Sequence, residues 1–144
     1  MTHAAGRALG LDLGSKRIGV AIGDRTGTIA SPLQVLQRSG SLRRDHLAIA
    51  KLVIDEEADI VVVGLPLNMD GSSGPAAEAA ISEAATLATV VSVPVVTFDE
   101  RRTTVTADQA MIEANMRAQA RRRIVDKIAA AVMLQNWLDT GRPR

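Results

Sequence analysis

Residues 8–23 read ALGLDLGSKRIGVAIG, and this stretch decides the fold class of the chain. Leucine occupies every second position of its first six residues, which is the period-two pattern of a strand over Ala8–Leu13. The Gly-Ser-Lys sequence that follows is a turn signal. Every second residue is then Ile or Val, which predicts another strand over Arg17–Gly23. The sequence therefore predicts a β-hairpin over residues 8–23.

The first predicted strand contains one acid, Asp12, on the face that also carries Ala8 and Gly10. Small neighbours leave space beside a carboxylate. An acid in a strand otherwise built of leucine is costly unless it is paired or bound to a cation. Asp12 is therefore a candidate metal ligand, and the alternative is a turn hydrogen bond near Gly14.

Beyond the hairpin, the apolar pattern changes between the periods of strands and helices. A third strand is predicted within residues 28–36, where Pro32 indicates a sheet edge or a bulge. The later predicted elements are a helix capped by Ser41 and ending near Glu57, a strand at residues 60–63, a helix beginning at Pro75, a strand at residues 93–98, a helix capped by Thr103 or Thr104 and ending near Ala114, and a last helix over residues 120–138. This order predicts one α/β domain over residues 1–144, whose mixed five-stranded sheet joins a three-stranded antiparallel meander to two parallel strands.

Apolar residues in two of these helices predict which side faces the sheet. In the helix after Ser41, the stripe at helical spacing consists of Leu47, Ala50 and Ile54. In the helix after Pro75, the corresponding residues are Ile81, Ala84, Ala85 and Ala88. We expect both sets in the core.

The composition excludes several classes of site. The chain has 144 residues, 47% of them hydrophobic, and no cysteine. Disulfides, zinc-thiolate sites and cysteine nucleophiles are therefore excluded. The first residues do not resemble a signal peptide, and no apolar run approaches the ~20 residues of a membrane helix. We expect a soluble cytoplasmic protein with no membrane partner.

Charges are distributed unevenly along the chain, although the net charge is only +1. The stretch from Leu52 to Glu100 contains acids and no Lys or Arg, so all 17 basic residues lie outside it. Such a chain can bind a polyanion at one surface and cations at another. An unevenly charged, solvated surface is the simpler explanation.

Two further acids occupy positions suited to a site. Glu100 follows the predicted strand at residues 93–98, and ligand sites of α/β sheets gather at the carboxyl ends of strands. Asp126 lies in the last predicted helix on a face of small and apolar residues, which are Ala129, Ala130 and Met133. Both acids therefore join Asp12 as candidates.

Each of these two acids has a simpler explanation. Glu100 could form a surface ion pair with the arginines that follow it. Asp126 could be an ordinary helix acid beside Lys127. Asp99 also competes with Glu100, because adjacent residues of a strand point to opposite faces. Spacing alone leaves these alternatives open.

Oxygen ligands, without cysteine and with only two histidines, favour Mg²⁺ or Mn²⁺ over zinc. Carboxylates that converge from separate elements can hold two ions about 4 Å apart and activate water for phosphodiester hydrolysis. Asp12, Glu100 and Asp126 are thus candidate catalytic and metal-binding residues. The nearby basic residues that could neutralise substrate phosphates are Lys16, Arg17, Arg101 and Arg102.

Four segments resemble the motifs of the YqgF/RuvX-type family, the Holliday-junction-resolvase-like proteins. They are ALGLDLGSKRIGVAIGD (residues 8–24), GLPLNMDGSSG (residues 64–74), DERRTT (residues 99–104) and RRRIVDKIAAAVMLQ (residues 121–135). The motifs run in the family order and cover nearly the whole chain, so together they are specific. The resemblance implies an RNase H-like fold with a metal-binding triad of Asp12, Glu100 and Asp126.

The resemblance also implies an activity. Members of this family are described as nucleases that process the 5′ end of precursor 16S ribosomal RNA, and resolution of Holliday junctions in DNA was an older proposal. A non-catalytic nucleic-acid-binding or ribosome-assembly factor is a further alternative. A junction resolvase needs two active sites whereas RNA trimming needs one, and the sequence leaves monomer and homodimer open.

Several other motif residues are predicted to contact substrate, and they are Lys16, Arg17, Asn68, Arg101, Thr103, Thr104 and Arg122. Simpler explanations are a solvated turn for the first two, an Asx-type turn in the loop of Asn68 and Asp70, and helix capping for the threonines. Gly14 and Gly19 either let a ligand approach the hairpin or serve as turn and packing glycines.

Sequence-specific binding of single-stranded RNA usually relies on aromatic side chains that stack on bases. This chain has one Phe, one Trp and no Tyr, and Trp137 is predicted to pack in the core or at the helix edge. We therefore expect recognition of the backbone and shape of a structured RNA or a DNA junction. The densest basic stretch, of which one or two residues can face substrate, comprises Arg117, Arg121, Arg122, Arg123 and Lys127.

The hairpin also resembles the phosphate-binding hairpin of the actin/hexokinase-type ATPases, which share the RNase H-like core. Those proteins enclose a nucleotide between two such lobes. A chain of 144 residues has room for one lobe, and the sequence contains no second hairpin of this kind. Nucleotide binding is therefore the weaker alternative.

Overall fold

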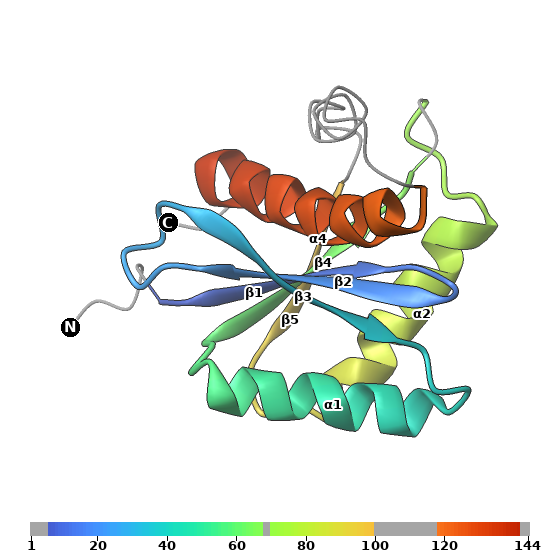
Figure 1. The fold of residues 1–144 in the computed structure, drawn as a ribbon, viewed down its shortest axis with the longest axis horizontal. Helices are drawn as coiled ribbons and strands as arrows, with labels where there is room; N and C mark the ends of the chain where they lie inside the picture. Colours follow the sequence, from blue (N-terminus) through green and yellow to red (C-terminus); the bar gives the residue numbers. More distant parts are fainter. Residues whose placement is uncertain (1–5, 68–69, 100–117, 142–144) are drawn as a thin grey trace.

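The computed structural model describes residues 6–67, 70–99 and 118–141, which form a five-stranded sheet with helices on both faces (Figure 1). In chain order the elements are β1 (Ala8–Leu13), β2 (Arg17–Gly23), β3 (Ala30–Gln37), α1 (Leu42–Asp55), β4 (Ile60–Leu65), α2 (Pro75–Ala88), β5 (Val95–Asp99), α4 (Ala118–Asn136) and a turn of π-helix (Trp137–Gly141). The strand order is β3-β2-β1-β4-β5. Neighbours are antiparallel from β1 to β3 and parallel from β1 through β4 to β5, which confirms the predicted mixed sheet.

Alternation along β1 separates two hydrophobic cores, one on each face of the sheet. Leu9 and Leu11 pack with residues of α1 and α2. Ala8 belongs to the opposite core, which is covered by Leu134 of α4 and Trp137 of the π-helical turn, among other residues. Trp137 is buried, as predicted. The predicted division of β1 into two faces is therefore confirmed.

Pro32 has the effect on β3 that the sequence predicts. β3 is an edge strand, and its pairing with β2 shifts register between Val20 and Ala21. Val20 pairs with Gln34 and Ala21 pairs with Pro32, so Leu33 is the extra residue of a bulge. An edge strand with a bulge tolerates proline because fewer of its N–H groups are needed for pairing.

Helix α1 begins as predicted but turns a different side to the sheet. The Ser41 hydroxyl accepts a hydrogen bond from the Arg44 N–H, which confirms the predicted N-cap. The predicted stripe is wrong at Leu47 and Ile54, which are 48% and 70% exposed, whereas Ala50 is partly buried against the core. The buried residues of this helix are instead Asp45, His46, Ile49 and Val53. The stripe is displaced by one residue because two polar side chains are buried by partners from other elements.

Helix α2 confirms Pro75 at its first position. Its predicted packing face is only partly correct, because Ala84 is buried while Ile81 is 40% exposed, and Ala85 and Ala88 are also exposed. The buried set is Ala77, Ala80, Ala84 and Leu87. Alanine occurs on nearly every side of this helix, so apolar spacing alone could not select one face.

Helix α4 lies across the sheet on the side opposite α1 and α2 (Figure 1). It begins at Ala118 and ends at Asn136, close to the predicted helix over residues 120–138. The helix predicted to end near Ala114 lies outside the described residues. Within the part of the chain that the structure describes, no helix is both long and apolar enough to cross a membrane.

Candidate functional site

Asp12 lies near the carboxyl end of β1, on the face of the sheet that α4 covers. Its partner in β2 is Gly19. The parallel register of β1 with β4, continued by one residue, sets Gly64 on its other side. Neither flanking strand therefore places a side chain beside Asp12 in its row, and the residue is partly exposed.

Helix α4 runs antiparallel to β1, so its earlier turns lie toward the carboxyl end of that strand. Leu134 packs directly on Gly10, where an added Cβ atom would lie 2.9 Å from Leu134 Cβ. One turn later in the sequence, Leu138 packs near the amino end of β1. The backbone position of Asp126, two turns before Leu134, therefore lies toward the end of β1 that carries Asp12.

Asp99 lies on the opposite face of the sheet from Asp12. Phe98 of β5 belongs to the core on the α4 side. Asp99 follows it in the same strand and so faces the side of α1 and α2. The structure therefore separates Asp99 from Asp12, while Glu100 lies outside the described residues.

The turn between β1 and β2 carries two of the residues predicted to bind substrate. Lys16 is exposed at this turn, and Arg17 is the first residue of β2. Arg17 precedes Gly19 by two positions and therefore lies on the face of Asp12. The structure thus brings Arg17 and Asp12 to one face and one end of the sheet.

The remaining predicted site residues lie partly or wholly outside the described structure. Only the backbone is described for Arg122 and Asp126, which belong to α4. The predicted residues that fall wholly outside it are Asn68, Glu100, Arg101, Thr103 and Thr104.

The loop before α2 contains an Asx-type turn, which is the simpler explanation offered for it above. Asp70 Oδ1 accepts hydrogen bonds from the Ser72 N–H at 2.9 Å and the Ser72 hydroxyl at 2.6 Å. Gly71, between them, has a φ of 90°. Asp70 therefore shapes this loop.

The donor chemistry at Asp12 fits a hard divalent cation. Carboxylate oxygens are ligands that Mg²⁺ and Mn²⁺ prefer, and the flanking glycines leave room for an ion with its water molecules. No cluster of three acids or histidines suited to a metal ion occurs among the described side chains. The side chains of Glu100 and Asp126, the other two predicted ligands, are not among those described.

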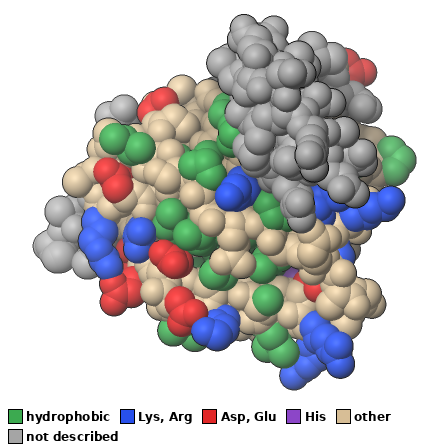
Figure 2. All heavy atoms as spheres, viewed as in Figure 1, with side chains coloured by type: hydrophobic (Ala, Val, Ile, Leu, Met, Phe, Trp, Pro, Cys, Tyr) green, Lys and Arg blue, Asp and Glu red, His purple; other side chains and the backbone are tan. Residues whose placement is uncertain are grey.

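Acidic and basic side chains are interspersed on the face shown in Figure 2. The structure contains exposed ion pairs between Lys51 and Asp55 and between Arg25 and Glu57. On this face, charges of both signs are mixed, as expected for a solvated surface.

Sequence reasoning missed a buried network of four ionisable side chains, Arg38, Asp45, His46 and Glu83. The Arg38 guanidinium donates to both carboxylate oxygens of Glu83, at 2.7 and 2.9 Å, and lies 3.5 Å from Asp45. His46 Nε2 is 2.8 Å from Glu83 Oε2, and it donates because an ionised carboxylate only accepts. The predicted packing face of α1 included Leu47, and it therefore left His46 outside the core. Two glutamates, Glu78 and Glu83, stand among the alanines of α2, and the sequence alone did not show that only Glu83 joins the network.

The network lowers the pKa of two buried carboxylates. Burial raises the pKa of Glu83, but hydrogen bonds from Arg38 and His46 outweigh it and leave the pKa below its ordinary value of 4.5. Burial also raises the pKa of Asp45, and hydrogen bonds from Ser39 together with Arg38 bring it below 3.8. Both carboxylates thus stabilise the fold above their unfolded pKa values, and this stabilisation is lost as pH falls through the lower folded values.

Glu83→Gln should therefore make the free energy of unfolding less dependent on pH in acid. Each unit by which the pKa of Glu83 is lowered contributes about 1.4 kcal/mol of stability at neutral pH, and the variant lacks this contribution. The stability difference between wild type and variant should be smaller at an acidic pH below 4.5 than at about pH 6.5, because Glu83 takes up a proton as pH falls through its lowered pKa. Urea unfolding at the two pH values measures it.

Glu78→Gln is the matched control, because Glu78 is an exposed acid of the same helix. It should change the free energy of unfolding by no more than a few tenths of a kcal/mol at either pH. Equal stability differences for Glu83→Gln at both pH values would contradict the assignment of a lowered pKa.

Solved structures with a similar fold include Holliday junction resolvases. Thermus thermophilus RuvC in complex with a Holliday junction substrate aligns with a TM-score of 0.58 at 15% identity, covering 95% of this chain and 97% of that one. The yeast mitochondrial Holliday junction resolvase aligns with a TM-score of 0.54 at 8% identity, covering 93% and 78%. These likenesses show the RNase H-like fold that the sequence resemblance implies.

Sequence comparison extends this likeness to a family. A relative from Myxococcus xanthus is 46% identical over 137 residues, covering 95% of this chain and 90% of the relative, and one from Geobacillus kaustophilus is 43% identical, covering 94% and 99%. Both are named as candidate pre-16S rRNA nucleases. The family model described as "RuvX: Holliday junction resolvase" matches residues 6–140. The chain therefore belongs to the RuvX family.

Proposed function

We propose that this chain is a metal-dependent nuclease that processes the 5′ end of precursor 16S ribosomal RNA in the cytoplasm. Relatives that are 40–46% identical over nearly the whole chain are named as candidate nucleases of this substrate. The proposal treats residues 1–144 as one nuclease domain, with Mg²⁺ or Mn²⁺ as its cofactor.

The position of Asp12 is the observation that carries the proposal. It is an acid in the central strand of the sheet, with glycines at its level in both neighbouring strands. This open row would let a phosphodiester backbone approach the carboxylate closely. Arg17 lies on the same face and Lys16 is exposed beside it, so both could bind the phosphates next to the cleaved bond.

Asp12, Glu100 and Asp126 would together hold the divalent ions. When bound, such ions supply an activated water and stabilise the leaving oxygen of the phosphodiester. We assign the second ligand to Glu100 and not to Asp99, because Asp99 faces the side of the sheet away from Asp12. The position of Asp126 on α4, toward the same end of β1, supports its place as the third ligand.

Resolution of four-way DNA junctions is the second candidate function. The family description and the fold neighbour that is bound to a Holliday junction favour it. Symmetric cutting of a junction needs two active sites, which a two-fold homodimer would supply. A non-catalytic ribosome-assembly factor is the third candidate.

A substrate panel distinguishes these functions. Wild-type protein with Mn²⁺ or Mg²⁺ is incubated with a precursor 16S rRNA fragment, an unrelated structured RNA and a four-way DNA junction. We expect cleavage at the 5′ end of the precursor, and EDTA should abolish it. Cleavage of the DNA junction alone would contradict rRNA processing and support the resolvase function. Binding without any cleavage would contradict the nuclease proposal.

A further inference from the structure

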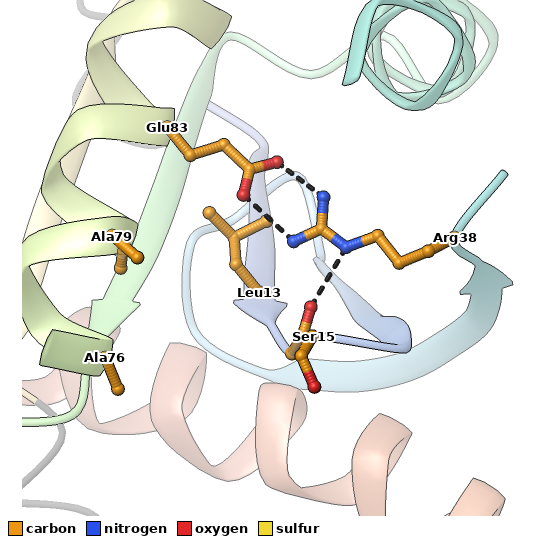
Figure 3. A pocket seen from close by; sticks show the side chains of 8 residues that line it. Leu13, Ser15, Arg38, Ala76, Ala79 and Glu83 are labelled. Atoms are coloured by element: carbon orange, nitrogen blue, oxygen red, sulfur yellow. Dashed lines mark hydrogen bonds and ion pairs between the residues drawn. The ribbon is translucent and has the colours of Figure 1, made fainter. Parts of the chain in front are cut away.

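A buried pair of opposite charges, Arg38 and Glu83, spans the space between the β1–β2 turn and α2 (Figure 3). The two side chains are 15% and 11% exposed. Arg38 also donates from Nε to the Gly14 carbonyl oxygen at 2.9 Å, and from its main-chain N–H to the Lys16 carbonyl oxygen at 2.9 Å. Arg38 therefore binds two carbonyl groups of the turn and is itself anchored to α2 by Glu83.

The space that the pair crosses is a pocket of about 160 Å³. The residues that line it are Leu13, Gly14 and Ser15 from the hairpin, Ala76, Ala79 and Ala80 from α2, and the pair itself. Because this space is open, side-chain packing across it cannot fix the distance from the turn to α2. The charged pair supplies that connection.

Gly14 links this connection to Asp12. Its N–H donates to the Arg17 carbonyl oxygen at 3.0 Å and is 3.1 Å from the Asp12 carbonyl oxygen. An added Cβ atom at Gly14 would lie 2.6 Å from the Arg17 oxygen, so the turn requires glycine here. Both backbone polar groups of Gly14 are thus engaged, and a displacement of Gly14 must also move Asp12 or Arg17.

Stability alone does not explain a buried ion pair at this place. Replacing such a pair with apolar side chains of similar volume is often neutral or stabilising, because charges lose their hydration on burial. The pair does fix one geometry, since a guanidinium that bridges a carboxylate and a carbonyl has little freedom. Its position between the turn and α2 therefore indicates a role in placement.

We propose that Arg38 is a positioning residue for substrate binding: anchored by Glu83, it holds the β1–β2 turn so that Lys16 and Arg17 meet substrate phosphates beside Asp12. This inference rests on the proposed nuclease function. It adds two residues, Arg38 directly after β3 and Glu83 in α2, that contact no substrate and act through the turn.

Arg38→Lys is the first test variant. Lysine keeps the positive charge near Glu83, but its single ammonium group cannot bridge both carboxylate oxygens and also reach the Gly14 carbonyl. We expect kcat/KM with Mn²⁺ to fall about tenfold, since a displacement near 1 Å can cost up to a hundredfold. Glu83→Gln should act in the same direction, and it replaces Arg38→Lys if that variant does not fold.

Arg25→Lys is the matched control, because Arg25 also pairs with a distant glutamate, Glu57, but in an exposed position. Its kcat/KM should stay within about twofold of wild type, since exposed pairs contribute little. Urea unfolding of each variant confirms that the assays compare folded proteins.

A double-mutant cycle with Lys16→Ala separates positioning from general stability. The effects of substitutions at independent sites add in free energy, so their fold-changes in kcat/KM multiply. The effects of substitutions at residues that act through one structural unit are not additive. We expect the Arg38→Lys/Lys16→Ala variant to be within about threefold of the worse single variant. Fold-changes that multiply, or a single variant as active as wild type, would overturn the proposal.

The same cycle in EDTA, with affinity for a labelled RNA stem-loop as the readout, distinguishes the two proposals. If wild type cleaves its substrate and the folded Arg38→Lys variant cleaves and binds equally well, the positioning role alone is wrong. If wild type cleaves no substrate of the panel, the nuclease proposal is wrong. In that case, a non-additive cycle for RNA affinity would still support a positioning role of Arg38 in RNA binding. An additive cycle would contradict the positioning role as well as the nuclease function.

Discussion

Replacing Asp12 with asparagine should lower metal-dependent cleavage by about a thousandfold while leaving RNA binding nearly intact. Asparagine keeps the size of the side chain but removes the charge that would hold a divalent ion. The stabilisation that a bound ion gives the transition state is several kcal/mol, and about 1.4 kcal/mol corresponds to a factor of ten. Binding should persist because basic residues supply it. Single-turnover cleavage with Mn²⁺ and RNA affinity in EDTA measure the two effects.

Asp55→Asn is the control for this experiment. Asp55 is an exposed acid of α1 that accepts a hydrogen bond from Lys51 at 2.7 Å, so the same charge is removed away from the site. Its cleavage rate should stay within about twofold of wild type. An Asp12→Asn variant that cleaves normally would remove Asp12 from the metal site. Loss of RNA affinity together with cleavage would indicate a role in binding.

The second large effect is expected at Gly10, where alanine should reduce the free energy of unfolding by about 2–3 kcal/mol. The added methyl group would lie 2.9 Å from Leu134 Cβ, which is the fixed base of that side chain. Relief requires α4 to move outward, which loosens the core around Ala130 and Trp137. Because Asp126 lies on this helix, cleavage should fall as well. Urea unfolding and the cleavage rate measure both effects.

Gly23→Ala is the matched control on the same face of the sheet. A Cβ atom there would meet the Ala8 carbonyl oxygen at 3.5 Å and Leu138 at 3.8 Å, which are ordinary contacts. The loss of stability should therefore stay below about 1 kcal/mol. An equal loss at Gly10 and Gly23 would show that the close contact with Leu134 is not the cause.

The strands were predictable from the sequence because their signals are local. Alternation gives Ala8–Leu13 and Arg17–Gly23 with the bounds that the structure has, and Pro32 marks an edge and a bulge. The packing faces of α1 and α2 were not predictable in the same way. Burial of His46 depends on Glu83, 37 residues later in the chain, and no local pattern contains that pairing.

The candidate site was predictable in part. Small residues around an acid in a strand made Asp12 a candidate, and the strand pairing of the structure places Arg17 on its face. The sequence alone could not decide between Asp99 and Glu100. The decision required the three-dimensional sheet, because the core around Phe98 shows which side of β5 faces α4. The contact between Arg38 and Glu83 joins residues 45 positions apart and could not be read from either segment.

The packing of α4 on β1 also determines when the protein can begin to work. The strands β1, β2 and β3 are neighbours in the sequence as well as in the sheet, so their pairing involves short loops and can form early. Leu134 and Trp137, which cover this face, follow all the described strands in the sequence and are synthesised after them. With the proposed triad divided between β1 and α4, a nascent chain is expected to stay inactive until α4 leaves the ribosome. An enzyme that acts on ribosomal precursors would thus be inactive while it is still attached to the ribosome that synthesises it.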